Sequence, residues 1–232
     1  FAFELGHIVK DGLRRMYGEN SENIYYYLTV YNEPYVHPAE PENLDVEGLL
    51  KGIYLYSPAS KKRKKNAQIL ASGVGVNWAL KAQQLLADDW GVKASVWSVT
   101  SWNELRRDGL EADRHNLLNP KDKHTAYVTK KLKGARGPVI AVSDYMRAVQ
   151  DQISPWVEQP FYSLGTDGFG LSDTRGALRR HFNVDAESIA IAVLQQLCNQ
   201  GDIKQSIVTK AMNKYRIHDV SAADAGNTEG SG

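Results

Sequence analysis

One short polar stretch holds the residues best suited to chemistry in this sequence. Asn32, Glu33, Tyr35 and His37 offer an amide, a carboxylate, a phenol and an imidazole. They follow residues 23–30 (NIYYYLTV), a continuous apolar and aromatic run that predicts a buried parallel strand. Ligands of open α/β sheets bind outside the carboxyl ends of the strands, so these four residues are candidates for lining a substrate channel. The alternative is a long loop packed against a neighbouring subunit.

Two other motifs look like cofactor or catalytic sites and have simpler explanations. Residues 72–78 (SGVGVNW) join a predicted strand to a predicted helix, as a dinucleotide-binding turn does. Trp78 stands in place of the third glycine, and no acidic residue ends the second strand to hold a ribose. We expect a tight turn without a ligand, with a bound anion left open. Ser101, with Glu104 three residues on, predicts a capping box rather than a nucleophile.

The cysteine and the histidines predict neither a thiol nucleophile nor a metal centre. Cys198 is the one cysteine, which excludes an intrachain disulfide, and its apolar helical surroundings favour a packed thiol. No histidine belongs to an H-E-x-x-H pair or has metal-site spacing to the cysteine. We therefore expect no metal ligands and place all histidines at the surface or the core edge: His7, His37, His115, His124, His181 and His218.

The composition is that of a soluble globular protein. Lys and Arg (28) nearly balance Asp and Glu (27), and the net charge of +1 requires neither nucleic acid nor an acidic membrane surface. No apolar stretch is long enough to span a bilayer, and no signal peptide is evident. These features predict a cytoplasmic protein without nucleic-acid or membrane partners.

The first part of the chain predicts the end of an α/β domain. Residues 3–17 have apolar positions at helical spacing, 46–50 predict a short helix, and 52–56 predict a strand. A natural chain rarely begins inside such a helix without a cap, so we expect a fragment cut on its N-terminal side. Residues 58–66, with five consecutive basic residues, predict a solvated linker; a nuclear-import or nucleic-acid patch is the alternative.

From residue 67 onward, predicted strands and helices alternate. This order predicts an α/β fold, with a mostly parallel sheet flanked by helices on both faces, over residues 67–220. Asp144 is the expected cap of the helix at 145–156, and residues 221–232 predict a disordered tail. The strands are expected at 67–71, 93–99, 138–142 and 161–164, and the other helices at 76–90, 103–118, 124–132, 175–182, 186–200 and 203–215.

The most distinctive stretch is residues 164–175, LGTDGFGLSDTR. Its glycines permit a tight corner, and Ser172, Asp173 or Thr174 can cap the helix that follows. Together with ENIYYYLTVYNEPY, SVTSWNELRRDG and PVIAVSDYMRAVQDQI, this wording resembles the homodimeric-type, thiamine-diphosphate-dependent pyruvate dehydrogenase family. The resembling segments span almost the whole chain in the family's order.

The resemblance implies a division of the chain and a chemistry. Residues 1–57 would be the end of the middle, pyrimidine-binding domain, and 67–220 a transketolase-like C-terminal domain. Family members decarboxylate pyruvate on thiamine diphosphate, held with magnesium, and transfer the acetyl group to the lipoyl arm of a dihydrolipoyl acetyltransferase component. The implied partners are a second copy of the chain, that component with its lipoyl domain, and the missing N-terminal portion.

The family's cofactor-binding groups are not expected in these residues. A glutamate must contact the aminopyrimidine ring and a G-D-G…N arrangement must hold magnesium; neither can be assigned here, because Asp167-Gly168 lies in the wrong setting. Catalytic residues are thus expected upstream of Phe1, and this part alone should be inactive, supporting dimerisation and the active-site entrance. The alternatives are a stand-alone nucleotide-binding or regulatory α/β module, and an interaction scaffold.

Overall fold

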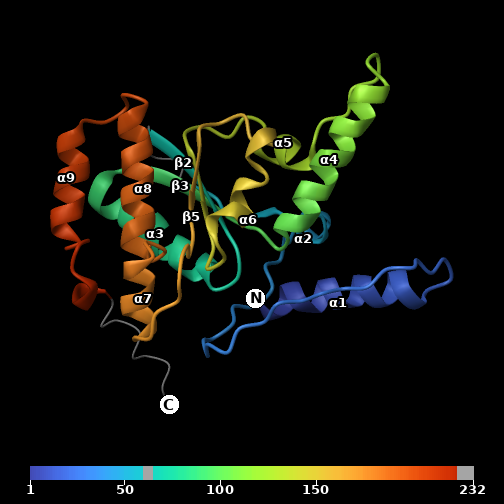
Figure 1. Cartoon of the computed structure of the whole chain (residues 1–232), viewed down its shortest axis with the longest axis horizontal. Coiled ribbons are helices and arrows are strands. Elements are labelled where there is room, and N and C mark those ends of the chain that lie inside the picture. Colours follow the sequence, from blue (N-terminus) through green and yellow to red (C-terminus); the bar gives the residue numbers. More distant parts are fainter. Residues whose placement is uncertain (60–64, 224–232) are drawn as a thin grey trace.

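A five-stranded sheet forms the centre of the computed structural model, which describes residues 1–59 and 65–223 (Figure 1). Residues 60–64 of the predicted linker and 224–232 of the predicted tail lie outside the described residues. The strand order is β1-β3-β2-β4-β5. The strands are β1 (Tyr54–Ser57), β2 (Lys65–Ala71), β3 (Val92–Ser98), β4 (Val139–Val142) and β5 (Phe161–Leu164).

The sheet is mostly parallel, as predicted. Strand β2 pairs in parallel with β3 on one side and β4 on the other, and β4 pairs in parallel with β5. Strand β1 is antiparallel to β3. It belongs to residues 1–57, which the sequence assigned to a preceding domain, yet it joins the same sheet. The position of the domain boundary stays a prediction.

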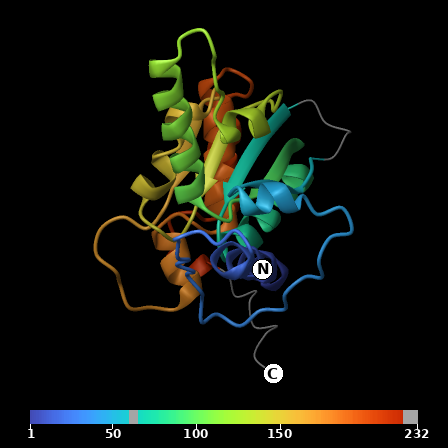
Figure 2. The same cartoon turned by 90° about the vertical axis from the view of Figure 1, so that its right-hand side faces the viewer.

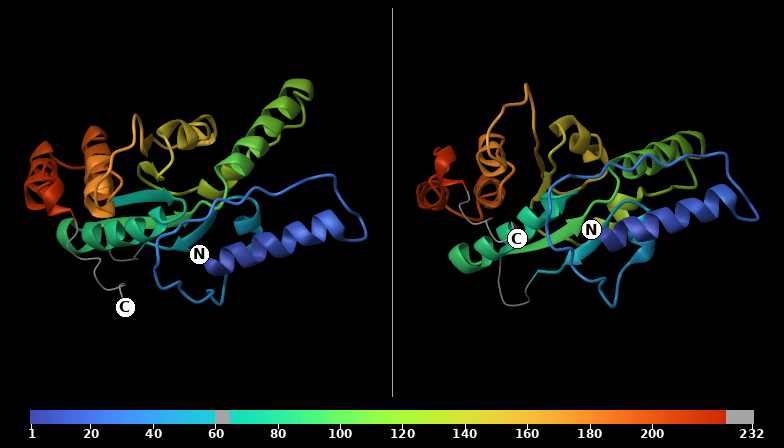
Figure 3. Two further views of the ribbon diagram at one scale, coloured as in Figure 1. Left: turned by 60° about the horizontal axis from the view of Figure 1, so that its bottom comes forward. Right: turned by 90° about the horizontal axis from the view of Figure 1, so that it is seen from below.

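Helices cover both faces of the sheet (Figures 1 and 3). One face packs against α3 (Gly75–Trp90), α8 (Ala186–Asn199) and α9 (Gln205–Lys214), and the other against α4 (Trp102–Leu118) and α5 (Tyr127–Leu132). Neighbouring side chains on β2 show the alternation: Ile69 faces the first layer and Leu70 the second, and both are 0% exposed. A strand that is buried on both faces carries apolar residues at consecutive positions, as β2 does with Ile69 and Leu70.

A buried ion pair ties the glycine corner's helix to the C-terminal layer. On α7 (Arg175–His181), Arg180 is 2% exposed and its guanidinium donates to the carboxylates of Asp185 and Glu187. It also donates to the Tyr215 carbonyl at 3.1 Å. The Asp185 carboxylate additionally accepts the backbone N–H of Ser188 at 2.9 Å and so caps α8. One charge cluster therefore fixes α7, α8 and the segment after α9.

The predicted strand at residues 23–30 is wrong. Helix α1 (Ala2–Tyr17) forms as expected, but the chain after it runs back along the helix without strand pairing (Figure 3). Tyr26 lies against the helix, where a Cβ added at Gly12 would come within 3.2 Å of its ring. Tyr25 and Tyr27, which alternate with it, are 88% and 84% exposed. The surface of a helix covers only one side of this run and offers no backbone N–H or C=O groups for strand pairing. Apolar residues alone were therefore not enough to form a strand here.

The expected cap at Asp144 is also wrong. Instead of one helix over 145–156, the chain forms α6 (Arg147–Asp151) and a 3₁₀ turn, Ser154–Trp156. The Tyr145 carbonyl accepts the N–H of Thr166 at 2.9 Å, so this backbone pairs with the glycine corner rather than starting a helix. Short elements complete the described chain: α2 (Val46–Leu50), where predicted, and a 3₁₀ turn at Val220–Ala222. Among the described residues, no helix has the length and apolar character to cross a membrane.

Replacing Arg180 tests the buried ion pair. Arg180→Ala should lower the free energy of unfolding by about 3–5 kcal/mol, because Asp185 would remain as a buried charge without its partner. The double variant Arg180→Met/Asp185→Asn, which keeps a capping oxygen and removes both charges, should recover much of that loss. Urea denaturation monitored by circular dichroism measures both.

Arg216→Ala, which removes the exposed pair with Asp219, is the control and should cost no more than about 1 kcal/mol. An Arg180→Ala loss no larger than the control's would contradict the buried pair.

Candidate functional site

The candidate site is a pocket of about 660 Å³ at the carboxyl edge of the sheet. Figure 2 shows α1 and the segment after it gathered below the sheet. The pocket lies between α1, residues 27–37, the turns that follow β2 and β3, and the start of α6. Of the four residues predicted for a substrate channel, Glu33, Tyr35 and His37 line this pocket and Asn32 does not.

Tyr31 joins the segment to two strand-end turns. Its hydroxyl donates to the Asp144 carboxylate at 2.8 Å, just after β4. Its ring lies over the turn after β2, since a Cβ added at Gly73 would come within 2.3 Å of the hydroxyl oxygen. Gly73 also has a φ of +57°, so a larger residue would be strained as well as crowded. Burial, reinforced by the Asp144 charge, raises the pKa of Tyr31 well above its usual range. Nearby, the hydroxyls of Thr29 and Tyr145 share a 2.6 Å hydrogen bond.

Glu33 and Asn32 join the segment to α7. The Glu33 carboxylate accepts a hydrogen bond from Arg179, and both side chains are largely buried, at 19% and 13% exposed. The Arg179 guanidinium lies 4.6 Å from the centre of the Trp78 ring. Asn32 accepts a longer bond, 3.4 Å, from Arg175. Trp78, which excludes a dinucleotide turn by its size, here forms the platform on which the Arg179–Glu33 pair rests.

Tyr35 and His37 form an aromatic corner at the start of α1. Their ring centres are 4.4 Å apart, and the Tyr35 ring packs edge-on against Phe1. The Nδ1 atom of His37 accepts the N–H of Ala2 at 3.1 Å. Burial raises the pKa of Tyr35. The four predicted residues thus make intramolecular contacts that fix the segment, and their contact with a substrate stays a prediction.

Glu4 is a site residue that the sequence reasoning missed. It is 7% exposed on α1, and its Oε1 atom accepts hydrogen bonds from Tyr54 at 2.7 Å and from Ser98 at 2.6 Å. Burial and the Glu4 charge together raise the pKa of Tyr54 above its usual range. The sequence did contain a signal for this role. Glu4 lies four residues before Ile8, which places an acidic residue on the apolar face of a predicted helix.

The serines at the strand ends are engaged in structural hydrogen bonds. The Ser72 hydroxyl donates to Ser143 at 2.9 Å and accepts the indole N–H of Trp102 at 3.0 Å. Ser101 accepts the N–H of Glu104 at 3.1 Å, which confirms it as the N-cap of α4. These partners position turns and include no base that would activate a serine.

The glycine-rich stretch at residues 164–175 is anchored at its start, while its middle is an exposed loop in which Phe169 is 96% exposed. Arg147 donates to Asp167 from its backbone N–H at 2.9 Å and from its Nε atom at 2.7 Å, and these bonds lower the pKa of the Asp167 carboxyl. A Cβ at Gly165 would lie 2.5 Å from the Tyr145 carbonyl oxygen, so only glycine fits. Thr174 caps α7, as one of the three expected candidates. The paired Asp167 does not fit a magnesium-binding role, which requires carboxylate oxygens free to face the ion.

Comparison with known proteins identifies families that match parts of this chain, and relatives that are longer than it. Residues 52–185 match the family described as transketolase-like TK C-terminal domain, and residues 1–38 match the pyruvate dehydrogenase E1 component middle domain. A protein of Mycolicibacterium smegmatis named pyruvate dehydrogenase E1 component is 60% identical over 96% of this chain and 24% of its own length. One of the same name from Mycobacterium tuberculosis is 56% identical over 99% of this chain and 25% of its own.

The chain therefore spans about a quarter of the length of the curated relatives it matches. Among solved structures, a transketolase of Pichia stipitis aligns with 68% of this chain and 20% of its own. That alignment has 21% identity and a TM-score of 0.45.

Removing the Tyr31 hydroxyl tests its contact with Asp144. Tyr31→Phe should lower the free energy of unfolding by about 1 kcal/mol at neutral pH. The pKa of Tyr31 is raised in the folded state above an unfolded value of about 10, so its contribution is present below pH 10 and is lost at higher pH. The difference between wild type and variant should accordingly shrink from about pH 7 to about pH 11.

Urea titrations at both pH values measure this difference. Tyr27→Phe, at a ring that is 84% exposed, is the control and should change stability by less than about 0.5 kcal/mol at both. A Tyr31→Phe effect that stays constant with pH would count against the hydrogen bond between the Tyr31 phenol and Asp144.

Proposed function

This chain belongs to the transketolase-like TK C-terminal domain family, and from that premise we propose that it is the C-terminal part of a pyruvate dehydrogenase E1 component. The observation that carries the proposal is the 60% identity to a protein of that name over nearly the whole chain. The order of the matches supports it too, with the E1 middle domain at residues 1–38 followed by the C-terminal domain at 52–185.

The proposed activity is that of the whole enzyme. It decarboxylates pyruvate oxidatively on thiamine diphosphate and transfers the acetyl group to the lipoyl arm of a dihydrolipoyl acetyltransferase component. The enzyme acts as a homodimer in the cytoplasm. Thiamine diphosphate supplies the electron sink for decarboxylation, and the protein supplies position and proton transfer. We propose that the groups that bind magnesium and the diphosphate lie outside the 232 residues of this chain, since Asp167 is already paired with Arg147.

Within that enzyme, the proposed role of this chain is to shape the active-site entrance and to support the dimer. The segment with Asn32, Glu33, Tyr35 and His37 crosses the carboxyl edge of the sheet, where α/β proteins place their ligands. Its contacts with α7 hold it there through the Glu33–Arg179 and Asn32–Arg175 pairs. A segment fixed at both a pocket and the glycine corner is suited to guiding a substrate arm.

An activity assay on two proteins tests the assignment. The product of the complete reading frame, supplied with thiamine diphosphate and magnesium, should reduce an artificial electron acceptor in the presence of pyruvate. The isolated 232-residue chain should not, because the cofactor-binding groups lie elsewhere. Activity of the isolated chain would show that the placement of the cofactor site is wrong. Inactivity of both would favour the nucleotide-binding module, which a nucleotide-dependent rise in melting temperature would reveal.

Alanine substitutions in the segment test the entrance role. In the complete enzyme, Glu33→Ala and Asn32→Ala should lower the activity with pyruvate or with a lipoyl domain by about 10- to 100-fold, because the segment loses its hold on α7 and moves. Steady-state kinetics with each substrate measure the effect. Glu42→Ala is the matched control, an exposed acid in the same segment, and should leave both activities unchanged. If both variants had the same kinetics as the wild type in both assays, the proposed entrance role would be wrong.

A further inference from the structure

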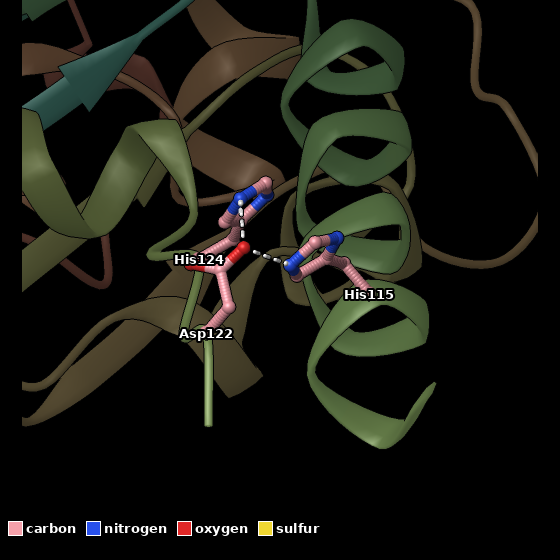
Figure 4. A group of neighbouring side chains, drawn as sticks. All are labelled: His115, Asp122 and His124. Atoms are coloured by element: carbon pink, nitrogen blue, oxygen red, sulfur yellow. Dashed lines mark hydrogen bonds and ion pairs between the residues drawn. The ribbon is translucent and has the colours of Figure 1, made fainter. Parts of the chain in front are cut away.

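A second cluster of reactive side chains lies far from the pocket, at the end of α4 (Figure 4). His115 is in the last turn of that helix, and Asp122 and His124 are in the loop that follows. The Nε2 atoms of the two imidazoles both approach the same carboxylate oxygen, Oδ2 of Asp122, at 3.1 Å and 3.8 Å. The three potential ligand atoms all lie within 4.8 Å of one another.

The loop is folded so that the two imidazoles meet. The Asn116 side chain makes a pair of hydrogen bonds with the backbone of His124, accepting its N–H at 2.7 Å and donating to its carbonyl at 2.8 Å. The Asn119 carbonyl accepts the N–H of Asp122 at 3.0 Å, which closes the turn. The rings of His115 and His124 are consequently stacked, with their centres 3.5 Å apart and an interplanar angle of 6°. The arrangement is therefore fixed by backbone contacts rather than by the side chains alone.

The spacing suits a transition-metal ion. A tetrahedral ion with bonds of about 2.0–2.1 Å places its ligands about 3.3 Å apart. The Nε2–Oδ2 separations of 3.1 Å and 3.8 Å bracket that value. An ion binds an imidazole nitrogen in the plane of its ring, so the stacked rings must rotate out of their parallel arrangement for both Nε2 atoms to face one ion. Asp122 and His124 are exposed and free of core packing that would resist such rotations, and their surface position leaves room for water as a further ligand.

The chemistry of the donors selects the class of ion. Two imidazoles and one carboxylate suit zinc, copper or nickel, whereas magnesium and calcium favour sites made of oxygen. Lys121 and Lys123 flank Asp122 in sequence, so long-range attraction does not favour a cation here and binding must come from direct coordination.

We propose that His115, Asp122 and His124 form a binding site for one divalent transition-metal ion, with water completing its coordination. The bound ion holds residues 119–124 against the C-terminal turn of α4. No metal ligand was predicted from the sequence, because the spacing H-x₆-D-x-H becomes meaningful only once the helix is known to end at Leu118. This site is independent of the proposed enzymatic function.

Zinc titration of the whole 232-residue chain tests the proposal. Isothermal calorimetry with zinc chloride should show one saturable site, and His115→Ala and His124→Ala should each weaken it at least tenfold. Removing an outer-shell partner of a metal ligand already costs about 10- to 100-fold in affinity, so removing a ligand should cost no less. Asp122→Asn, which keeps the side-chain shape, should weaken binding too.

The matched control is His7→Ala. His7 is a partly exposed histidine whose Nε2 atom lies 3.1 Å from the Glu40 carboxylate, the same distance as in the His115–Asp122 pair, but this pair has no second imidazole. This variant should bind zinc as the wild type does. X-ray absorption at the zinc edge of the loaded wild type should detect two imidazole ligands. No saturable binding by the wild type, equal affinity in His115→Ala and His124→Ala, or a spectrum without imidazole would overturn the proposal.

Discussion

Burial of the central strands on both faces is the constraint on which the rest of this structure depends. Strand β2 places Ile69 against one helical layer and Leu70 against the other, with both fully buried, and β4 does the same with Ile140 and Ala141. Nearly all side chains on such strands must be apolar. Gln68 on β2 is a buried polar exception, whose side-chain oxygen accepts the indole N–H of Trp97. The carboxyl ends of the strands carry both the serine network and the candidate pocket.

That polar edge is completed by the first part of the chain. Glu4 reaches Ser98 at the end of β3, Tyr31 reaches Asp144 just after β4, and Glu33 reaches Arg179 on α7. A largely buried carboxylate such as that of Glu4 or Glu33 is stable only with its hydrogen bonds made, so these contacts constrain where α1 and residues 29–37 can lie. The segment matching the E1 middle domain and the C-terminal domain are joined by these polar pairs, and a function at the edge would belong to both.

The two candidate sites differ in how they are held. Residues 31–33 depend on partners more than 100 positions away, such as Arg179 for Glu33. The His115, Asp122 and His124 cluster is assembled within ten residues by a helix end and one asparagine. The first can respond to changes elsewhere in the fold, whereas the second needs little besides the end of α4.

The sequence by itself determined the elements whose signals are local. The parallel strands and the Ser101 and Thr174 caps were predicted, because periodicity and capping act within a few residues. The tight corner expected from the glycines of residues 164–175 is instead an exposed loop. Only the tertiary structure decided what residues 23–30 and Asp144 became. The run NIYYYLTV lacks a neighbouring strand in the described chain and lies on α1, and Asp144 receives Tyr31 instead of capping a helix. Which groups meet across 113 or 146 positions depends on how the layers pack, and no local pattern encodes that.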